Sequence, residues 1–467
     1  MVEKLRDNIL KVEPSDWRWS ATIVGLMKYF KNYNLESEVK MDDDFIEFDL
    51  KLLDDEKYLK FAEKHFKENM HHKKVEELIS IENPSDEIVK EVNEKLSKNA
   101  SSNTVMLKTF KKIKYDGTNS KEIQKIIDEN RLNLIEQTFK GGRALYFNFC
   151  NENNLLKDPG KSCRIRGYSL DMGKKGKSAS YMGDQKTFVY EDSKLFDFIP
   201  FAFSLTRESF FINNNFTIKQ LLESNKNDIF EKENNIKSEL FFKVKESSRY
   251  INYDAEIIRK DRENEYFDTV YLRKESIKRF AKINKKTLDA ISKSQELKRY
   301  KGNLFGEQVV KSTGDRYYLN IQNIVVNCVI NNLKLDDLID VLLREENKNY
   351  VISHLIDINM GGKMNLETKK VEQKKAIASA MGIKQKFLRE GKQNKLRAYE
   401  QRFISAITLK DYDRVKELLL HISATTQQPL PFINVLFEDF EENKDIAYTF
   451  INALGEKKID KNKGGNE

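Results

Sequence analysis

The acidic residues around position 49 have the types and spacing that one class of metal-dependent nucleases uses. Asp49 and Lys51 form an acid-x-Lys triplet, and aspartates precede them at residues 42–44. In such nucleases two carboxylates hold a metal ion and the lysine helps to orient the attacking water. Residues 42–44 are too close to Asp49 for the usual hairpin geometry, and triplets of this form arise by chance in a chain with 33% charged residues. A nuclease using Asp49 and Lys51 is therefore the alternative hypothesis.

Other patterns that bind metal ions, phosphates or substrates are incomplete in this sequence. The histidines within residues 65–72 have no Cys or carboxylate pattern at ligand spacing, so we expect them at the surface. Residues 176–178 (Gly-Lys-Ser) end like a phosphate-binding loop, but Asp171 stands where that loop needs its first glycine. Cys150 and Cys163 have no partners for a metal site, and nothing marks a nucleophile elbow. The sequence therefore predicts no catalytic residue, no metal and no cofactor.

A polar stretch at residues 151–186 is rich in Gly, Lys and Ser and has weak periodicity, which predicts a long loop or an irregular hairpin. Loops of this length are often functional. A flexible basic loop can enter a DNA groove or hold a nucleic-acid backbone, and it can equally be a disordered surface loop. The basic residues that would make such contacts are Arg164, Arg166, Lys174, Lys175 and Lys177.

The positive charge of the chain is concentrated in a few segments. The net charge is only +8 over 467 residues. Residues 271–301 and 369–402 each contain 11 basic and 3 acidic residues, and residues 157–186 contain 8 basic and 3 acidic residues. Segregated Lys and Arg suit a polyanion such as nucleic acid, because each neutralised phosphate releases counterions. The alternative is that these segments are solvated helix faces.

Strands and helices are both needed to position these segments. Ser15-Asp16 is typical of a helix N-cap, and the apolar residues among Trp19–Phe30 fall on one face of the helix that follows. Residues 44–51 alternate in part and predict a strand. Residues 139–150 predict a Gly-Gly turn that leads into a strand, and the aromatic run 196–211 predicts a core strand.

Helical patterns dominate the remainder, and they are continuous after residue 317. The expected fold class is α+β, with a mixed α/β N-terminal region followed by an all-α C-terminal helical bundle. We expect domains at residues 1–334 and 335–455, and a disordered tail at residues 456–467. Three cysteines, the absence of a signal peptide and the absence of a membrane span favour a cytoplasmic protein.

Several short motifs resemble one protein family. Residues 16–17 (Asp-Trp) and 23–26 (Ile-Val-Gly-Leu) resemble its opening, and the acidic strand at residues 44–50 is followed by Tyr-Leu-Lys-Phe at residues 58–61. The aromatic segment within residues 198–213 (FIPFAF, then ESFFIN) adds to the match. The family is the large subunit of type I-B CRISPR effector complexes (Cascade), the Cas-eight family. The resemblance extends over most of the chain, and the order of its regions also fits.

One feature departs from the family pattern. Many members carry two C-x-x-C pairs in the middle of the chain, and these pairs would bind zinc. This chain has only Cys150 and Cys163 there, and residues 196–203 stand where the second pair is expected. The departure implies that packing around the aromatic run replaces the metal.

The resemblance implies a non-catalytic subunit that recognises DNA. Such a subunit binds the short protospacer-adjacent motif in target double-stranded DNA, helps R-loop formation and recruits a separate helicase–nuclease. Its partners would be the crRNA and the Cascade backbone, crRNA-processing and small subunits. Guide pairing then recognises the target sequence, while the protein recognises the motif and the shape of the backbone.

The resemblance also suggests which residues contact nucleic acid. Basic side chains are expected to follow phosphates, and the candidates are Arg273, Lys278, Arg279, Lys282, Lys285, Lys286, Lys374, Lys375, Lys384 and Lys386. Recognition of the motif needs loop residues that hydrogen-bond base edges. The two candidate loops are residues 160–177 and the loop of Ser101, Ser102, Asn103 and Thr104.

In this family the helical C-terminal part resembles the separate small subunit, which some systems make by internal translation of the same gene. Here residues 361–363 (Gly-Gly-Lys) directly precede Met364, and their codons can spell a ribosome-binding sequence before a start codon. The product would comprise residues 364–467. The alternative is a Gly-Gly turn between two helices.

Overall fold

The computed structural model describes most of the chain. The residues that it describes are 2–6, 8–97, 104–111, 113–159, 163–166, 192–205, 208–226, 244, 247–251, 253–261, 266–292, 321–344, 349–361 and 366–455. The chain forms two compact units. Unit 1 comprises Met1–Lys232 and Tyr253–Tyr271, and unit 2 comprises Glu233–Asn252 and Leu272–Glu467. The expected domain boundary at 334/335 stays a prediction, and the expected disordered tail lies outside the described residues.

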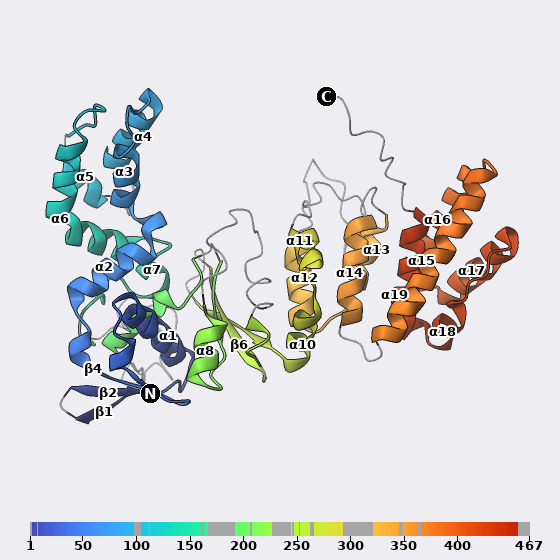
Figure 1. Cartoon of the computed structure of the whole chain (residues 1–467), viewed down its shortest axis with the longest axis horizontal. Coiled ribbons are helices and arrows are strands. Elements are labelled where there is room, and N and C mark those ends of the chain that lie inside the picture. Colours follow the sequence, from blue (N-terminus) through green and yellow to red (C-terminus); the bar gives the residue numbers. More distant parts are fainter. Residues whose placement is uncertain are drawn as a thin grey trace, which may run out of the picture. The chain divides into compact units, whose positions relative to one another are not determined.

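Unit 1 combines helices with two small antiparallel sheets, whose strand orders are β1-β2-β4-β3 and β5-β6-β7 (Figure 1). The strands are β1 Val2–Arg6, β2 Ile9–Val12, β3 Lys40–Met41, β4 Ile46–Asp49, β5 Glu208–Asn213, β6 Ala255–Asp261 and β7 Asp268–Leu272. The α-helices are α1 Trp17–Asn32, α2 Asp55–His65, α3 His71–Ile79, α4 Asp86–Ser97, α5 Thr104–Phe110, α6 Ser120–Gly141, α7 Tyr146–Phe149 and α8 Ile218–Ser224. The 3-10 helices are η1 Glu36–Glu38, η2 Leu50–Leu52, η3 Lys67–Asn69 and η6 Lys194–Phe201.

Helix α1 lies in the main core of unit 1 and begins where the sequence predicts. The Asp16 carboxylate accepts hydrogen bonds from two backbone N–H groups of the first turn, which would otherwise lack acceptors. Trp19 is fully buried, and its ring packs on Phe196 with 4.6 Å between the ring centroids. Gly25 allows η6 to approach α1 closely, because a Cβ atom at Gly25 would lie 2.0 Å from the carbonyl oxygen of Phe198.

The aromatic run at residues 196–211 is not a core strand, which corrects the expectation from sequence. Its first part belongs to η6, and only Glu208–Asn213 forms a strand, β5, which pairs with β6. Pro200 disfavours a central strand because it has no N–H group for the ladder. Leu195–Phe201 are all buried. Other core residues therefore contact these side chains on every side of the short helix. In a strand, successive side chains would point alternately to the two faces of the sheet.

Residues 139–150 also differ from the expected turn and strand. Helix α6 continues to Gly141, and the short helix α7 follows. Within this stretch only Cys150 has a strand-like contact, an isolated antiparallel bridge with Ile165. Tyr146 and Phe149, at the two ends of α7, are buried. The apolar pattern therefore predicted burial correctly and the type of element incorrectly.

The described part of unit 2 is helical, which confirms the α+β class with a helical C-terminal region. Its helices are α10 Lys274–Lys282, α11 Lys285–Ser292, α12 Ile321–Ile330, α13 Asp336–Leu342, α14 Asn349–Gly361, α15 Leu366–Arg389, α16 Gln393–Thr408, α17 Tyr412–Thr426, α18 Ile433–Glu438 and α19 Phe440–Gly455. Helix α19 is buried along most of its length and packs against α15 and α14 (Figure 1). Within the described ranges, no helix is long and apolar enough to cross a membrane.

Candidate nucleic-acid interface

Helix α10 presents lysines to solvent because its apolar residues face inward. Ile277 and Phe280 are buried, and their spacing of three residues places them on one side of the helix. Lys278 and Lys282 are exposed, and so is Arg273, the residue that precedes the helix. These three candidates from the first basic segment are therefore accessible to a ligand.

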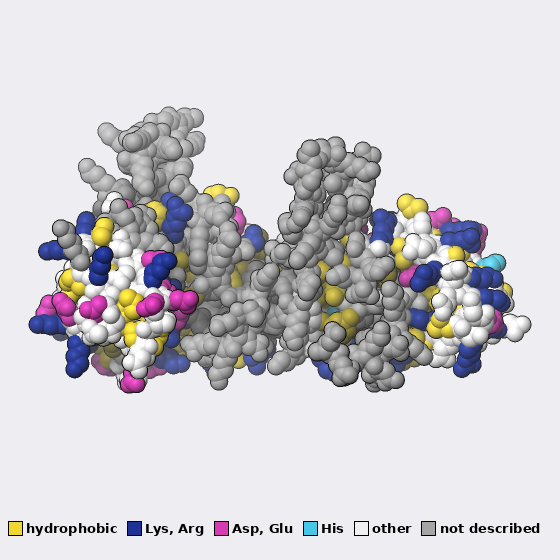
Figure 2. Space-filling view, turned by 90° about the horizontal axis from the view of Figure 1, so that it is seen from above, with side chains coloured by type: hydrophobic (Ala, Val, Ile, Leu, Met, Phe, Trp, Pro, Cys, Tyr) yellow, Lys and Arg dark blue, Asp and Glu magenta, His cyan; other side chains and the backbone are white. Residues whose placement is uncertain are grey.

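Helix α15 has the same arrangement in the second basic segment. Ala376, Ala380 and Ile383 are buried, and the helix packs on α19. Lys370 and Lys374 are exposed. Figure 2 shows Lys and Arg side chains gathered at its right-hand end, which the C-terminal helices form, with few Asp and Glu side chains among them.

A shallow hollow in unit 2 brings the two basic segments together. Lys282, the last residue of α10, and Lys370, in the second turn of α15, both line it. Thr287 of α11 and two residues near the end of α14, Asp357 and Ile358, also line this hollow. We call this feature the α11 hollow, because α11 begins at its edge. Nothing in the sequence predicted that these two lysines lie near each other.

A polar contact that the sequence analysis missed holds α11 beside α14. Thr287 Oγ1 lies 3.0 Å from His354 Nδ1, and the Thr287 backbone N–H donates to Asn284 Oδ1 at 2.8 Å. Burial lowers the pKa of His354, which favours the neutral form of its ring. The Asn284 side chain thus caps the first turn of α11, as asparagine often does directly before a helix. His354 carried no such signal, because its partner comes from another helix.

The prediction that Arg164 contacts DNA is wrong, because its side chain is completely buried. Its Nη1 lies 2.7 Å from Asp197 Oδ1 and its Nε lies 3.4 Å from Asp192 Oδ1. The guanidinium also donates to the backbone carbonyl oxygens of Asn154 and Lys157. Burial raises the pKa of Asp197 to about 6 although Arg164 opposes this, so the pair is ionised at pH 7. The signal in the sequence was Asp197, which stands inside an apolar run. A buried aspartate needs a partner of opposite charge, because an unpaired buried charge is highly unfavourable.

Arg279 is withdrawn for the same reason, since only 3% of it is exposed. It donates hydrogen bonds to the carbonyl oxygens of Leu333 (2.5 Å) and Ile358 (3.2 Å) and to Asn359 Oδ1 (3.2 Å). These acceptors lie at the end of α14 and between α12 and α13. Arg279 therefore fastens α10 to its neighbours, and Lys282 follows it by one turn.

The remaining candidates differ in their exposure. Lys286 is exposed, and Lys384 is buried, which removes it from the set. Lys375, Lys386 and Arg166 are half-buried, and each makes a polar or ring contact within the protein. The structure does not describe the side chains of Ser101, Ser102, Asn103, Thr104, Lys174, Lys175, Lys177 and Lys285.

The acid-x-Lys triplet is not arranged as a nuclease site. Asp49 Oδ1 accepts the backbone N–H of Lys51 at 2.9 Å and so caps η2. Residues 42–44 lie in the turn between β3 and β4, whereas Asp49 ends β4, and a strand of this length separates them by roughly 10 Å. Among the residues that the structure describes, no three His, Cys, Asp or Glu side chains gather as metal ligands. The nuclease hypothesis therefore has no support.

Cys150 and Cys163 belong to the apolar core of unit 1. Cys150 Sγ lies 4.0 Å from the carbonyl oxygen of Phe196. Phe203, from the same aromatic segment, packs on Phe149 with 4.9 Å between the ring centroids. Both cysteines thus lie in a core that includes these aromatic side chains, and the replacement of a family zinc site by packing stays a prediction.

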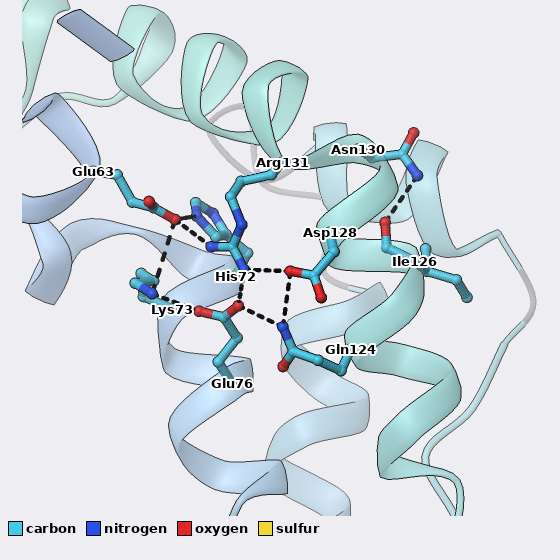
Figure 3. A network of polar contacts seen from close by, with 9 residues as sticks. All are labelled: Glu63, His72, Lys73, Glu76, Gln124, Ile126, Asp128, Asn130 and Arg131. Carbon is cyan, nitrogen blue, oxygen red and sulfur yellow. Dashed lines mark hydrogen bonds and ion pairs between the residues drawn. The ribbon is translucent and has the colours of Figure 1, made fainter. Parts of the chain in front are cut away.

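A polar network in unit 1 corrects the expectation that the histidines lie at the surface (Figure 3). Arg131 on α6 donates hydrogen bonds to Glu63 on α2 at 2.6 Å and to Glu76 on α3. His72 is fully buried, and its Nε2 lies 2.8 Å from the Glu63 carboxylate. Burial lowers the pKa of His65 to about 3, because aromatic rings surround it. The network joins α2 of the main core to α3–α6, which form a second apolar core.

Comparison with known proteins places the chain in a family. A family model described as CRISPR-associated protein Csx8 matches residues 9–235 and 222–454. No curated protein and no solved structure matches the chain. The match extends over most of both units, and it confirms the resemblance at the level of a CRISPR-associated family. The chain belongs to the CRISPR-associated protein Csx8 family.

Proposed function

We propose that this protein is the non-catalytic large subunit of a CRISPR RNA-guided surveillance complex of the type I-B Cascade class. The observation that carries the proposal is the meeting of two basic segments in unit 2 of a CRISPR-associated protein. Lys282 and Lys370 line one hollow, and exposed Lys278 and Lys374 lie one turn away on the same helices. Spaced ammonium groups on neighbouring helices suit the phosphates of a nucleic-acid backbone.

In this role the protein recognises the protospacer-adjacent motif in target double-stranded DNA, helps R-loop formation and recruits a helicase–nuclease. Lysines of α10 and α15 hold the backbone and fix the register, whereas loop side chains contact base edges. Guide pairing recognises the remainder of the target. A subunit with these tasks needs exposed basic helices and no catalytic group of its own.

The proposed partners follow from the same role. The protein binds crRNA and target DNA, and it assembles with the Cascade backbone, crRNA-processing and small subunits. We propose that it acts in the cytoplasm, where invading DNA meets the complex.

The direct test compares complexes assembled with and without this chain. Duplex targets share one protospacer and differ only in the bases that flank it. We expect discrimination among the flanking sequences only when the chain is present, because the guide does not pair with them. Equal discrimination without the chain would contradict the proposal.

A second test examines the basic helices. Changing both Lys278 and Lys374 to Glu should weaken binding of all duplex sequences alike, since phosphates carry no sequence information. The plot of log affinity against log salt has a negative slope, and this slope should become less steep by about 0.9 for each lost phosphate contact. Lys121→Glu on α6 of unit 1 makes the same change in charge at another exposed site and should leave the slope unchanged. An unchanged slope in the double variant would count against the role of these helices.

We also propose that the C-terminal helices are made separately from Met364 as a small subunit. Residues 362–365 lie outside the described part of the structure, and α15 begins at Leu366, so the product would start with a complete α15. Changing the Met364 codon to a non-start codon should remove the short product while the full chain is still made. A short product that still begins at this position would end the idea.

A further inference from the structure

The α11 hollow has an apolar floor and a basic rim. Ile283, Ile358 and Met360 line it and are buried, whereas Lys282 and Lys370 line it and are exposed. The hollow has a volume of about 110 Å³. This is below the range of pockets that enclose a whole ligand, so the hollow suits a small group such as one phosphate and not a folded partner. An apolar floor also strengthens attraction at the rim, because it lowers the local dielectric constant.

The position of one rim lysine is set by buried contacts. Arg279, one turn before Lys282, is fixed by the carbonyl oxygen of Ile358 and by Asn359 at the end of α14. The stem of Lys282 lies over Gly361, since a Cβ atom at Gly361 would be 3.8 Å from Lys282 Cβ. Little freedom of the α10 backbone is therefore lost when a ligand binds here, which favours affinity.

We propose that the α11 hollow binds a single phosphodiester of a nucleic-acid backbone, with Lys282 and Lys370 contacting the same phosphate. The inference rests on the proposed function and deepens it by assigning one site. The two lysines come from basic segments far apart in the sequence, and they share a phosphate because both helices line this hollow. Thr287 and Asn284 are polar residues that also line the hollow.

The hollow also contains one group that opposes an anion. The Asp357 carboxylate lines it, and Lys370 is close enough to lower the pKa of that carboxyl group, which burial raises overall. Because a carboxylate repels a phosphate, Asp357→Asn should tighten binding of the full chain to DNA by several-fold at low salt. A residue that only supports the fold would not produce this gain.

The decisive experiment is a double-mutant cycle on the full chain, read as affinity for one fixed DNA duplex at several salt concentrations. We expect Lys282→Gln and Lys370→Gln each to weaken binding by about 10-fold or more, as for the loss of a hydrogen bond to a charged group. The double variant should be less impaired than the product of the two effects predicts, because one contact is lost rather than two. Its salt slope should fall by about 0.9, the value for one phosphate.

Matched controls lie one turn away. Lys278→Gln and Lys374→Gln change exposed lysines of the same two helices that do not line the hollow. Under the proposed function these two lysines contact separate phosphates, so the effects of the two substitutions should multiply. The salt slope of the double variant should become less steep by about 1.8. Effects that multiply at Lys282 and Lys370 too, with the slope of two phosphates, would overturn the shared site.

The remaining outcomes separate this inference from the proposed function. Wild-type binding that depends on salt, with no change in the Lys282 and Lys370 variants, would overturn the hollow alone. Wild-type protein that binds no nucleic acid would refute both. The source of the phosphate is identified by comparing the affinities for two single strands, one with a 5′-phosphate end and one with a 5′-hydroxyl end. Equal affinities support a backbone phosphodiester, and dependence on the 5′-phosphate would overturn that assignment.

Discussion

The polar network of Figure 3 allows a quantitative prediction for Glu76. Its carboxylate accepts hydrogen bonds from Arg131, from Lys73 at 2.7 Å and from Gln124 at 2.8 Å, and its side chain is only 14% exposed. Burial by itself raises the pKa of Glu76, but these donors outweigh burial and lower the pKa to about 2 from 4.5. The perturbation is Glu76→Gln, which keeps the shape and removes the charge.

The magnitude follows from linkage between protonation and folding. Each unit of pKa shift corresponds to about 1.4 kcal/mol, so ionised Glu76 stabilises the folded state by about 3 kcal/mol at pH 7. The folded-state pKa lies below the unfolded value. The stabilisation is therefore fully present above about pH 4.5 and is lost as the pH falls towards about 2. We expect Glu76→Gln to lower the free energy of unfolding by about 3 kcal/mol at pH 7 and by only about 1 kcal/mol at pH 3.

Urea unfolding at several pH values, followed by far-ultraviolet circular dichroism, measures this difference. The control is Glu77→Gln, the same substitution at the adjacent exposed residue of α3, which should change stability by at most about 0.5 kcal/mol. A loss for Glu76→Gln that is the same at pH 3 as at pH 7 would refute the electrostatic reasoning. A loss no larger than that of the control would show that the network does not stabilise the fold.

Two further predictions concern the main core of unit 1, whose unfolding can be followed by fluorescence because both tryptophans of the chain lie in α1. Arg164→Met should lower the free energy of unfolding by about 3–5 kcal/mol, because it leaves a buried carboxylate without its partner, and half-buried Arg166→Met should lower it less. Small and equal losses of unfolding free energy in the two variants would indicate that Arg164 lies at the surface. Gly25→Ala should destabilise by about 1–3 kcal/mol or more, since its Cβ would collide with the Phe198 backbone. Gly141→Ala meets no atom within 4 Å and should cause no loss, so equal stabilities of the two alanine variants would contradict the close packing.

The sequence predicted features whose cause is local. Asp16 caps α1 as expected, because a carboxylate and the backbone of the next turn lie within three residues of each other. The helical C-terminal region also followed from its apolar spacing. The prediction of a strand at residues 196–211 was wrong, because an aromatic composition indicates burial but does not indicate the type of secondary structure.

The candidate site shows the same division. Segregation of basic residues was evident from the sequence, as was the family resemblance at the level that the Csx8 match confirms. The sequence did not distinguish Lys282, which is exposed, from Arg279, which is buried three residues earlier. That difference depends on carbonyl groups at the end of α14, which lie far from Arg279 along the chain.

The sequence by itself determined which segments are basic, where α1 begins and that helices follow in the C-terminal region, because charge, capping and periodicity are properties of neighbouring residues. Only the tertiary structure decided that Lys282 and Lys370 line one hollow and that Arg164 and Arg279 are enclosed. The physical reason is that the exposure and pairing of a charge are set by the groups that packing brings around it, and most of those groups are distant in the sequence.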